Sequence, residues 1–129
     1  MPGRYLLDTN AVIALFADDL DMFARLRSAK EVFVPSIVLG ELYYGARRSQ
    51  RIEENLARVE AFTAASAVLD CDHITARVYG ELKNSLRQVG RPIPENDIWI
   101  AAIAAQHNLT LMTRDAHFAG LQGLAIETW

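Results

Sequence analysis

Four acidic residues stand where carboxylates could gather around a metal ion. Asp8 ends the apolar run YLL in YLLDTNAVIALF, and Asp115 follows a second apolar run in MTRDAHF. If both runs are parallel strands, their carboxyl ends share the sheet edge at which ligands bind in open α/β sheets. Glu41, in SIVLGELYYG, falls in a helix after a third such run, near the same edge. Asp97, in PENDIWIAA, begins a helix whose position the topology alone does not fix.

Carboxylates that meet in one crevice repel each other unless protons or cations occupy the site. Oxygen ligands suit Mg²⁺ or Mn²⁺, and such ions can activate a water and stabilise the leaving oxygen of a phosphodiester. The polar neighbours Thr9, Asn10, Asn96 and Thr113 could hydrogen-bond the carboxylates as supporting residues. Each aspartate could instead be only a helix cap, and Glu41 only a surface helix residue.

Other kinds of chemistry have weaker support. His73, His107 and His117 have no closely spaced histidine or cysteine partners, which argues against a zinc site. His107 is expected near a helix C-terminus and His117 in a surface loop, while Cys71 is expected to be a small apolar filler. No glycine-rich nucleotide-binding motif occurs.

The elements that must position these residues alternate between strands and helices, which predicts an α/β fold with a parallel sheet and helices on both faces. Strands are expected at Tyr5–Leu7, Val32–Val34, Ala67–Leu69, Thr110–Met112 and Ala125–Glu127. Helices are expected at Ala11–Phe16, Leu20–Ala29, Ile37–Arg47, Ile52–Ala65, Ile74–Val89 and Ile98–His107. Ser36 is expected to cap the third helix, and Gly90 to stop the fifth.

The composition fits one globular domain over residues 1–129, with 51% hydrophobic residues and a net charge of −3. The longest apolar stretch, Ile98–Ala105, is too short to span a membrane, and with one cysteine and no recognisable leader the cytoplasm is the expected compartment. The acidic balance does not exclude a nucleic-acid partner, because metal ions could neutralise the four carboxylates. Candidate residues for contacting nucleic-acid phosphates are Arg47, Arg48, Arg51, Arg87, Arg91 and Arg114, which could instead be only solvated surface residues.

The ordered motifs YLLDTNAVIALF, VPSIVLGELYYGA, GRPIPENDIWIAA and LTLMTRDAHFAGLQGLAIETW resemble the PIN-domain nucleases, and among them the VapC-type toxins. The resemblance implies a three-layer α/β/α sandwich with Asp8, Glu41, Asp97 and Asp115 in one metal site. Thr113 would assist them, with Asn10 as a neighbour. The implied activity is Mg²⁺- or Mn²⁺-dependent endoribonuclease cleavage of structured RNA, often transfer or ribosomal RNA.

The same resemblance implies a homodimer and a separate VapB-type antitoxin that lays a helix along a groove. The expected groove lies on a helical hairpin, because apolar residues repeat at helical spacing in both helices. Its candidates are Leu39, Leu42, Tyr43, Leu56, Val59 and Phe62. The same stripes could be intrachain core.

Two other functions remain open at this stage. DTNAV partly matches the start of the haloacid-dehalogenase-like phosphatases, but Asn10 replaces the second aspartate, which serves as their general acid. A catalytically silent α/β module that binds RNA or protein is the other alternative.

Overall fold

Five parallel strands form the central sheet of the computed structural model, which describes residues 3–129. Their bounds are β1 Arg4–Leu7, β2 Glu31–Pro35, β3 Ala67–Leu69, β4 Thr110–Met112 and β5 Ile126–Glu127. The order across the sheet is β3-β2-β1-β4-β5. All five expected strands are therefore present.

The order in which the chain adds strands to the sheet reverses at the boundary between β1 and β4. From β1 it builds outward through β2 to β3, and it then returns to place β4 on the other side of β1. Leu6 lies beside Phe33 of β2 on one side, and Leu7 lies beside Met112 of β4 on the other. Ligand sites in open α/β sheets lie beyond the strand ends at such a switch point.

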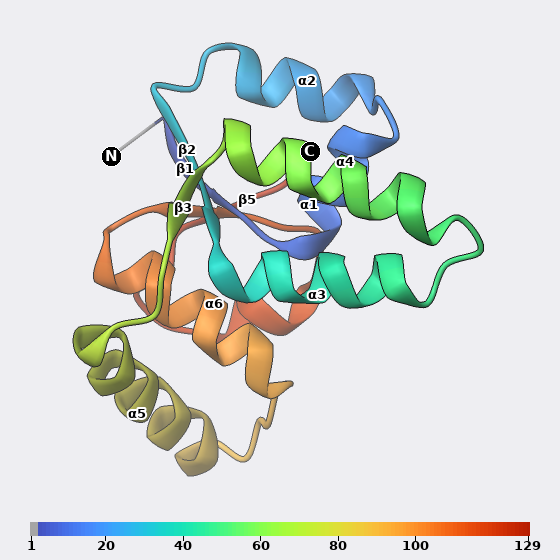
Figure 1. Cartoon of the computed structure of the whole chain (residues 1–129). Coiled ribbons are helices and arrows are strands. Elements are labelled where there is room, and N and C mark those ends of the chain that lie inside the picture. Colours follow the sequence, from blue (N-terminus) through green and yellow to red (C-terminus); the bar gives the residue numbers. More distant parts are fainter. Residues whose placement is uncertain (1–2) are drawn as a thin grey trace.

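Six α-helices cover the sheet, and the layers can be followed in Figure 1. α2 and α4 lie on one side of the sheet and α5 and α6 on the other, so the predicted three-layer α/β arrangement is confirmed. The bounds are α1 Thr9–Phe16, α2 Leu20–Arg27, α3 Ser36–Arg47, α4 Ile52–Ala65, α5 His73–Gln88 and α6 Glu95–Gln106, with a short 3₁₀ helix, η1, at Ala116–Gly120.

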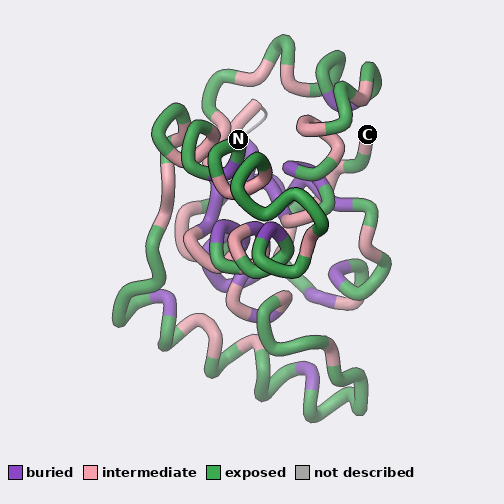
Figure 2. Tube along the Cα trace, turned by 45° about the vertical axis from the view of Figure 1, so that its right-hand side comes forward, coloured by how far each residue is buried: buried purple, intermediate pink, exposed green. Residues whose placement is uncertain are grey.

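The core includes the middle strands, α6 and buried residues of the first four helices, such as Val12, Met22, Leu42 and Val59. Leu6, Leu111 and Met112 have no exposed surface, and α6 buries Ile98, Ile100 and four further apolar residues. Figure 2 shows buried positions gathered in the centre and mostly exposed positions on the outer turns. The apolar stretch in α6 is therefore a buried helix, and no helix within residues 3–129 is long and apolar enough to cross a bilayer.

Several helix ends differ from expectation. Ser36 is the first residue of α3 rather than its cap, because Pro35 occupies the N-cap position without a side-chain hydrogen bond. α2 ends at Arg27 instead of Ala29. α6 begins at Glu95, three residues before the expected start, because Pro94 already occupies its N-cap position. Gly90 follows the C-cap of α5 with a φ of 66°, as expected of a helix stop.

Candidate metal centre

A cleft of ≈ 540 Å³ opens at the carboxyl edge of the sheet. Asp8, Glu41, Asp97 and Asp115 all line it, although they come from four separate segments of the chain. Asp8 follows β1 and Asp115 follows β4, so the sheet edge itself brings these two together. Asp97 reaches the same cleft from the first turn of α6, which the topology alone left open.

Asp8 is buried, with 4% of its surface exposed, and it also caps α1. One carboxylate oxygen accepts a hydrogen bond from the Ala11 amide at 2.8 Å, and the other accepts one from the Thr113 hydroxyl. Burial raises the pKa of Asp8, whereas the hydrogen bonds from Thr113 and Ala11 lower it. Capping and a place in the cleft are therefore compatible roles for this residue.

The buried hydroxyl of Thr113 connects two sides of the cleft. It donates to Asp8 and accepts a hydrogen bond from the Asp115 backbone amide at 2.9 Å. Both the donor and one acceptor position of the hydroxyl are used. Thr113 therefore fixes the Asp8 carboxylate relative to the loop that carries Asp115.

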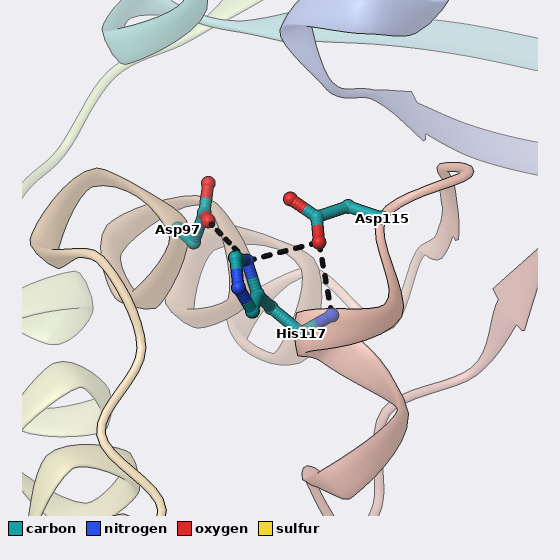
Figure 3. Close-up of side chains that lie close together, drawn as sticks. All are labelled: Asp97, Asp115 and His117. Carbon is teal, nitrogen blue, oxygen red and sulfur yellow. Dashed lines mark hydrogen bonds and ion pairs between the residues drawn. The ribbon is translucent and has the colours of Figure 1, made fainter.

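Asp97, Asp115 and His117 form the tightest group of possible ligands in the described part of the chain, within 4.8 Å of one another. Figure 3 shows the imidazole of His117 beside both carboxylates. His117 Nδ1 lies 2.9 Å from Asp115 Oδ1 and 3.6 Å from Asp97 Oδ2. His117 is exposed, as expected of a surface residue, but its position in η1 also places its ring in the lining of the cleft, which was not expected. Its position two residues after Asp115 was the available signal.

Asp97 has a strongly perturbed carboxyl group. Burial raises its pKa to about 6, and the nearby charges of Asp115, Glu41 and Asp8 act in the same direction, while His117 opposes them. At neutral pH this carboxyl group is mostly ionised, so a cation near Asp97 would be favoured because it offsets the neighbouring negative charges.

Glu41 reaches the cleft from the second turn of α3. Its carboxylate accepts a hydrogen bond from the Thr9 hydroxyl at 3.0 Å. Asn10 and Asn96 also line the cleft, but neither amide side chain hydrogen-bonds a carboxylate among the described residues. The expected polar support is therefore present for Thr9 and Thr113.

The cleft suits a hard divalent cation. It gathers four carboxylates, and partial burial together with the proximity of like charges raises the pKa of Asp8 and of Asp97. A divalent ion would relieve that repulsion, and an oxygen-rich donor set fits Mg²⁺ or Mn²⁺. The residues present thus fit the metal expected from sequence.

The six candidate arginines lie outside this cleft, and all are exposed. Arg47, Arg48 and Arg51 stand together at the turn between α3 and α4, where Arg51 pairs with Glu54 at 3.4 Å. The Arg91 guanidinium lies against Gly120, and Arg87 is in the last turn of α5. Arg114 is engaged within the chain, because it donates to the Trp129 carbonyl and lies over its ring.

An apolar groove of ≈ 200 Å³ adjoins the cleft between α1, α3 and α4. Thr9 and Glu41 line both hollows. Of the six groove candidates, Leu42 and Val59 line the groove, while Leu39 is buried and Tyr43, Leu56 and Phe62 are half-buried between the helices. The expected hairpin is thus largely intrachain core. Ile13 and Phe16 of α1, which the sequence did not suggest, form the opposite wall.

Two residues outside the cleft also had roles expected from the sequence. Cys71 is exposed between β3 and α5, so the filler assignment is wrong. His107 is the C-cap of α6, as expected from its place near a helix end.

Similarity to known proteins identifies the family. The chain matches the PIN domain family over residues 5–124, which includes all four cleft carboxylates. This chain is a member of the PIN-domain family. It is 36% identical to ribonuclease VapC2 of Haemophilus influenzae, with 98% of each chain covered. It is 33% identical to the tRNA(fMet)-specific endonuclease VapC of Shigella flexneri, again over 98% of each.

Solved structures of PIN-domain proteins share the fold. The DNA-bound VapBC structure from Salmonella typhimurium matches with a TM-score of 0.86 and 32% identity, covering 98% of both chains. VapBC-1 from nontypeable Haemophilus influenzae matches with a TM-score of 0.87 and 32% identity, covering 97% of both. The resemblance to VapC-type PIN domains is therefore confirmed over nearly the whole chain.

Proposed function

We propose that this PIN-domain protein is a metal-dependent endoribonuclease toxin of a toxin–antitoxin pair. The observation that carries the proposal is the meeting of Asp8, Glu41, Asp97 and Asp115 in one cleft at the switch point of the sheet. The proposal is supported by the ribonuclease names of relatives that match the chain end to end.

The proposal assigns a role to each acidic residue of the cleft. Asp8, Asp97 and Asp115 bind one or two Mg²⁺ or Mn²⁺ ions, and Glu41 completes the site or orients the attacking water. When bound, the metal supplies Lewis-acid activation of a water and stabilisation of the leaving oxygen. Thr113 holds Asp8 in position, and Thr9 does the same for Glu41.

The proposed substrate is structured RNA, with transfer or ribosomal RNA as the leading classes. A relative at 33% identity carries a name that specifies a transfer RNA. Hydrolysis by water breaks the bond between phosphorus and the 3′ oxygen, so one fragment keeps a 5′-phosphate and the other a 3′-hydroxyl. Such a substrate places the expected site of action in the cytoplasm.

The cognate partner in this proposal is a VapB-type antitoxin bound to a homodimer of this chain. Structural neighbours of this chain were solved as VapBC complexes. The groove between α1, α3 and α4 is the proposed antitoxin surface, because it is apolar and shares Thr9 and Glu41 with the cleft. A helix seated there would lie beside the carboxylates it must block.

The deciding experiment is cleavage of total cellular RNA by the purified, antitoxin-free protein. We expect discrete fragments with Mg²⁺ or Mn²⁺, and none with EDTA or in the variants Asp8→Asn and Asp97→Asn. Mass spectrometry should find 5′-phosphate ends, whereas a 2′,3′-cyclic phosphate would contradict attack by water. Absence of cleavage by folded wild-type protein with either metal would favour the silent binding module, and a covalent aspartyl-phosphate on Asp8 would favour the phosphatase.

A further inference from the structure

A second hollow adjoins the acidic cleft on the other side of Glu41 from the apolar groove. It has a volume of ≈ 410 Å³ and is lined by Ser36, Ile37, Gly40, Glu41, Tyr44 and Asn96. Glu41 and Asn96 also line the acidic cleft, so the two hollows adjoin each other. A polymer chain whose reacting bond lies in the cleft would extend into this hollow.

The wall of this hollow carries an aromatic ring that the core does not use. Tyr44 is 63% exposed, whereas Leu42 and Ala46, on the opposite side of α3, are buried. Tyr44 follows Glu41 by three residues, which places it on the same side of the helix and about 4.5 Å further along its axis. The ring is therefore close to the cleft and open to solvent.

A cation accompanies the ring. The Arg48 guanidinium lies 5.5 Å from the centroid of the Tyr44 ring, one helical turn further along α3. Gly40 leaves the hollow open, because a Cβ atom at this position would meet no other atom within 4 Å. An exposed ring with a guanidinium group and open space beside it is typical of sites that stack single-stranded bases and contact their phosphates.

We propose that Tyr44 and Arg48 form a stacking platform for an unpaired RNA base next to the bond that is cleaved. The inference rests on the proposed nuclease function and adds the requirement that the RNA be single-stranded at this position. The base would stack on the Tyr44 ring, with Arg48 beside the neighbouring phosphate and the polar side chains of Ser36 and Asn96 within the same hollow.

RNA explains this hollow better than a protein partner does. The hollow carries one aromatic ring, a neighbouring cation and polar side chains, and it adjoins a cleft proposed to bind phosphate. The apolar groove on the other side of Glu41 also holds a ring and a cation, since Arg58 lies 5.2 Å from the centroid of Phe16, but that ring packs against Phe62 and the core. Tyr44 is 63% exposed, so its ring is the one that is open to a base.

The test uses a short single-stranded oligouridylate that carries one 2-aminopurine, whose fluorescence is quenched when it stacks on an aromatic ring. The full-length Asp8→Asn variant serves as the non-cleaving background. In that background we expect quenching on binding, which Tyr44→Phe and Tyr44→Trp retain. Tyr44→Ala should abolish the quenching and raise Kd by roughly 5- to 150-fold, the range that corresponds to loss of one base stack.

Two further variants control for folding and for general surface effects. Gly40→Leu keeps the tyrosine but fills the open space, so it should also raise Kd, while circular dichroism confirms that the helix is intact. Val89→Ala, at a position 64% exposed at the end of α5, should leave both Kd and quenching unchanged.

Three outcomes would overturn the platform. Unchanged Kd and quenching in Tyr44→Ala, while wild-type protein still cleaves RNA, would reject the platform and leave the nuclease standing. A change of oligomeric state in Tyr44→Ala without a change in RNA binding would assign this face to contact between copies of the chain. If the wild type cleaves no RNA and the Asp8→Asn variant does not bind the oligonucleotide, both the nuclease and the platform are rejected.

Discussion

Thr113 shows how one hydroxyl can organise the acidic cleft. It donates to Asp8 and accepts from the amide of Asp115, and its own surface is only 2% exposed. No water can easily replace a hydroxyl in so buried a position. The distance between two carboxylates that come from opposite ends of the chain therefore depends on this side chain.

We expect Thr113→Val to keep the packing of the strand end and to lose the function. The substitution leaves the Asp115 amide without an acceptor and removes a donor from Asp8, which should cost about 1–3 kcal/mol in the free energy of unfolding. Urea denaturation would measure that loss, and titration with Mn²⁺ should show weaker binding. Thr113→Ser preserves the hydroxyl and should stay near wild type in both. Equal metal affinity in the valine variant would contradict the bridging role.

The sequence could predict some site residues better than others, for physical reasons. Asp8 and Asp115 follow parallel strands, so strand topology alone brings them to one edge. The place of Asp97 depends on the path of the loop before α6, and only the family resemblance suggested it. His117 was missed because its partners are carboxylates, whereas the sequence signal for a metal-binding histidine is a nearby histidine or cysteine.

At the scale of elements, α3 connects every surface proposed to bind a ligand. Glu41 lines the acidic cleft, the apolar groove and the hollow beside Tyr44, and the C-terminal end of the helix carries Arg47 and Arg48. One helix therefore positions the proposed metal ligand Glu41, the proposed base platform at Tyr44 and the cations at its C-terminal end. Its ends are set by Pro35 and by the turn before α4, which explains why its length was predicted closely although its cap was not.

Charge reversal at the end of α3 should weaken binding of RNA and flatten its salt dependence. For Arg47→Glu combined with Arg48→Glu, the slope of log Kd against log salt should fall by about 0.7 for each single-strand phosphate that the protein no longer neutralises. Fluorescence anisotropy over a range of salt concentrations would measure it. The matched control is Arg27→Glu with Arg77→Glu, two exposed arginines outside the candidate set. An unchanged slope would remove Arg47 and Arg48 from the RNA-binding surface.

A charged side chain introduced into the groove between α1, α3 and α4 should weaken binding of the proposed antitoxin. Ile13 is 49% exposed and lines the groove, so Ile13→Asp would place a carboxylate under a bound antitoxin helix. We expect the affinity for the co-expressed antitoxin to fall tenfold or more, measured by co-purification and then by titration. Val89→Asp is the surface control. Retained affinity would move the partner surface elsewhere, and Tyr43→Asp or Leu56→Asp would then test the hairpin predicted from sequence.

For the whole molecule, the acidic cleft lowers the free energy of unfolding of the metal-free protein at neutral pH. The pKa of Asp97 is about 6 in the folded protein, against an ordinary value of 3.8. Between pH 3.8 and about 6, the Asp97 carboxyl group keeps its proton in the folded protein, whereas the unfolded chain has released it. The resulting stabilisation is fully present below 3.8 and is lost as the pH rises through about 6.

Asp97→Asn should therefore stabilise the metal-free protein at neutral pH while abolishing cleavage. Thermal unfolding in EDTA should give both proteins a similar Tm near pH 4 and a variant that is higher by roughly 2–5 °C near pH 7. Mg²⁺ should raise the Tm of the wild type only, because the variant lacks a metal ligand. If the difference in Tm between the two proteins is the same at pH 4 and pH 7, the surroundings do not raise the pKa of the Asp97 carboxyl group.

The hydrogen bond between Asp8 and Thr113 determines how late during synthesis the acidic cleft can form. The two residues are 105 positions apart, and β4 must pair with β1 before they meet. A nascent chain on the ribosome therefore has no complete cleft until its last segment has emerged. The groove proposed to bind the antitoxin is lined by α1, α3 and α4, all of which are translated well before β4. Under the proposed function, an antitoxin already present in the cell would therefore meet its groove before the chain has a complete cleft for RNA.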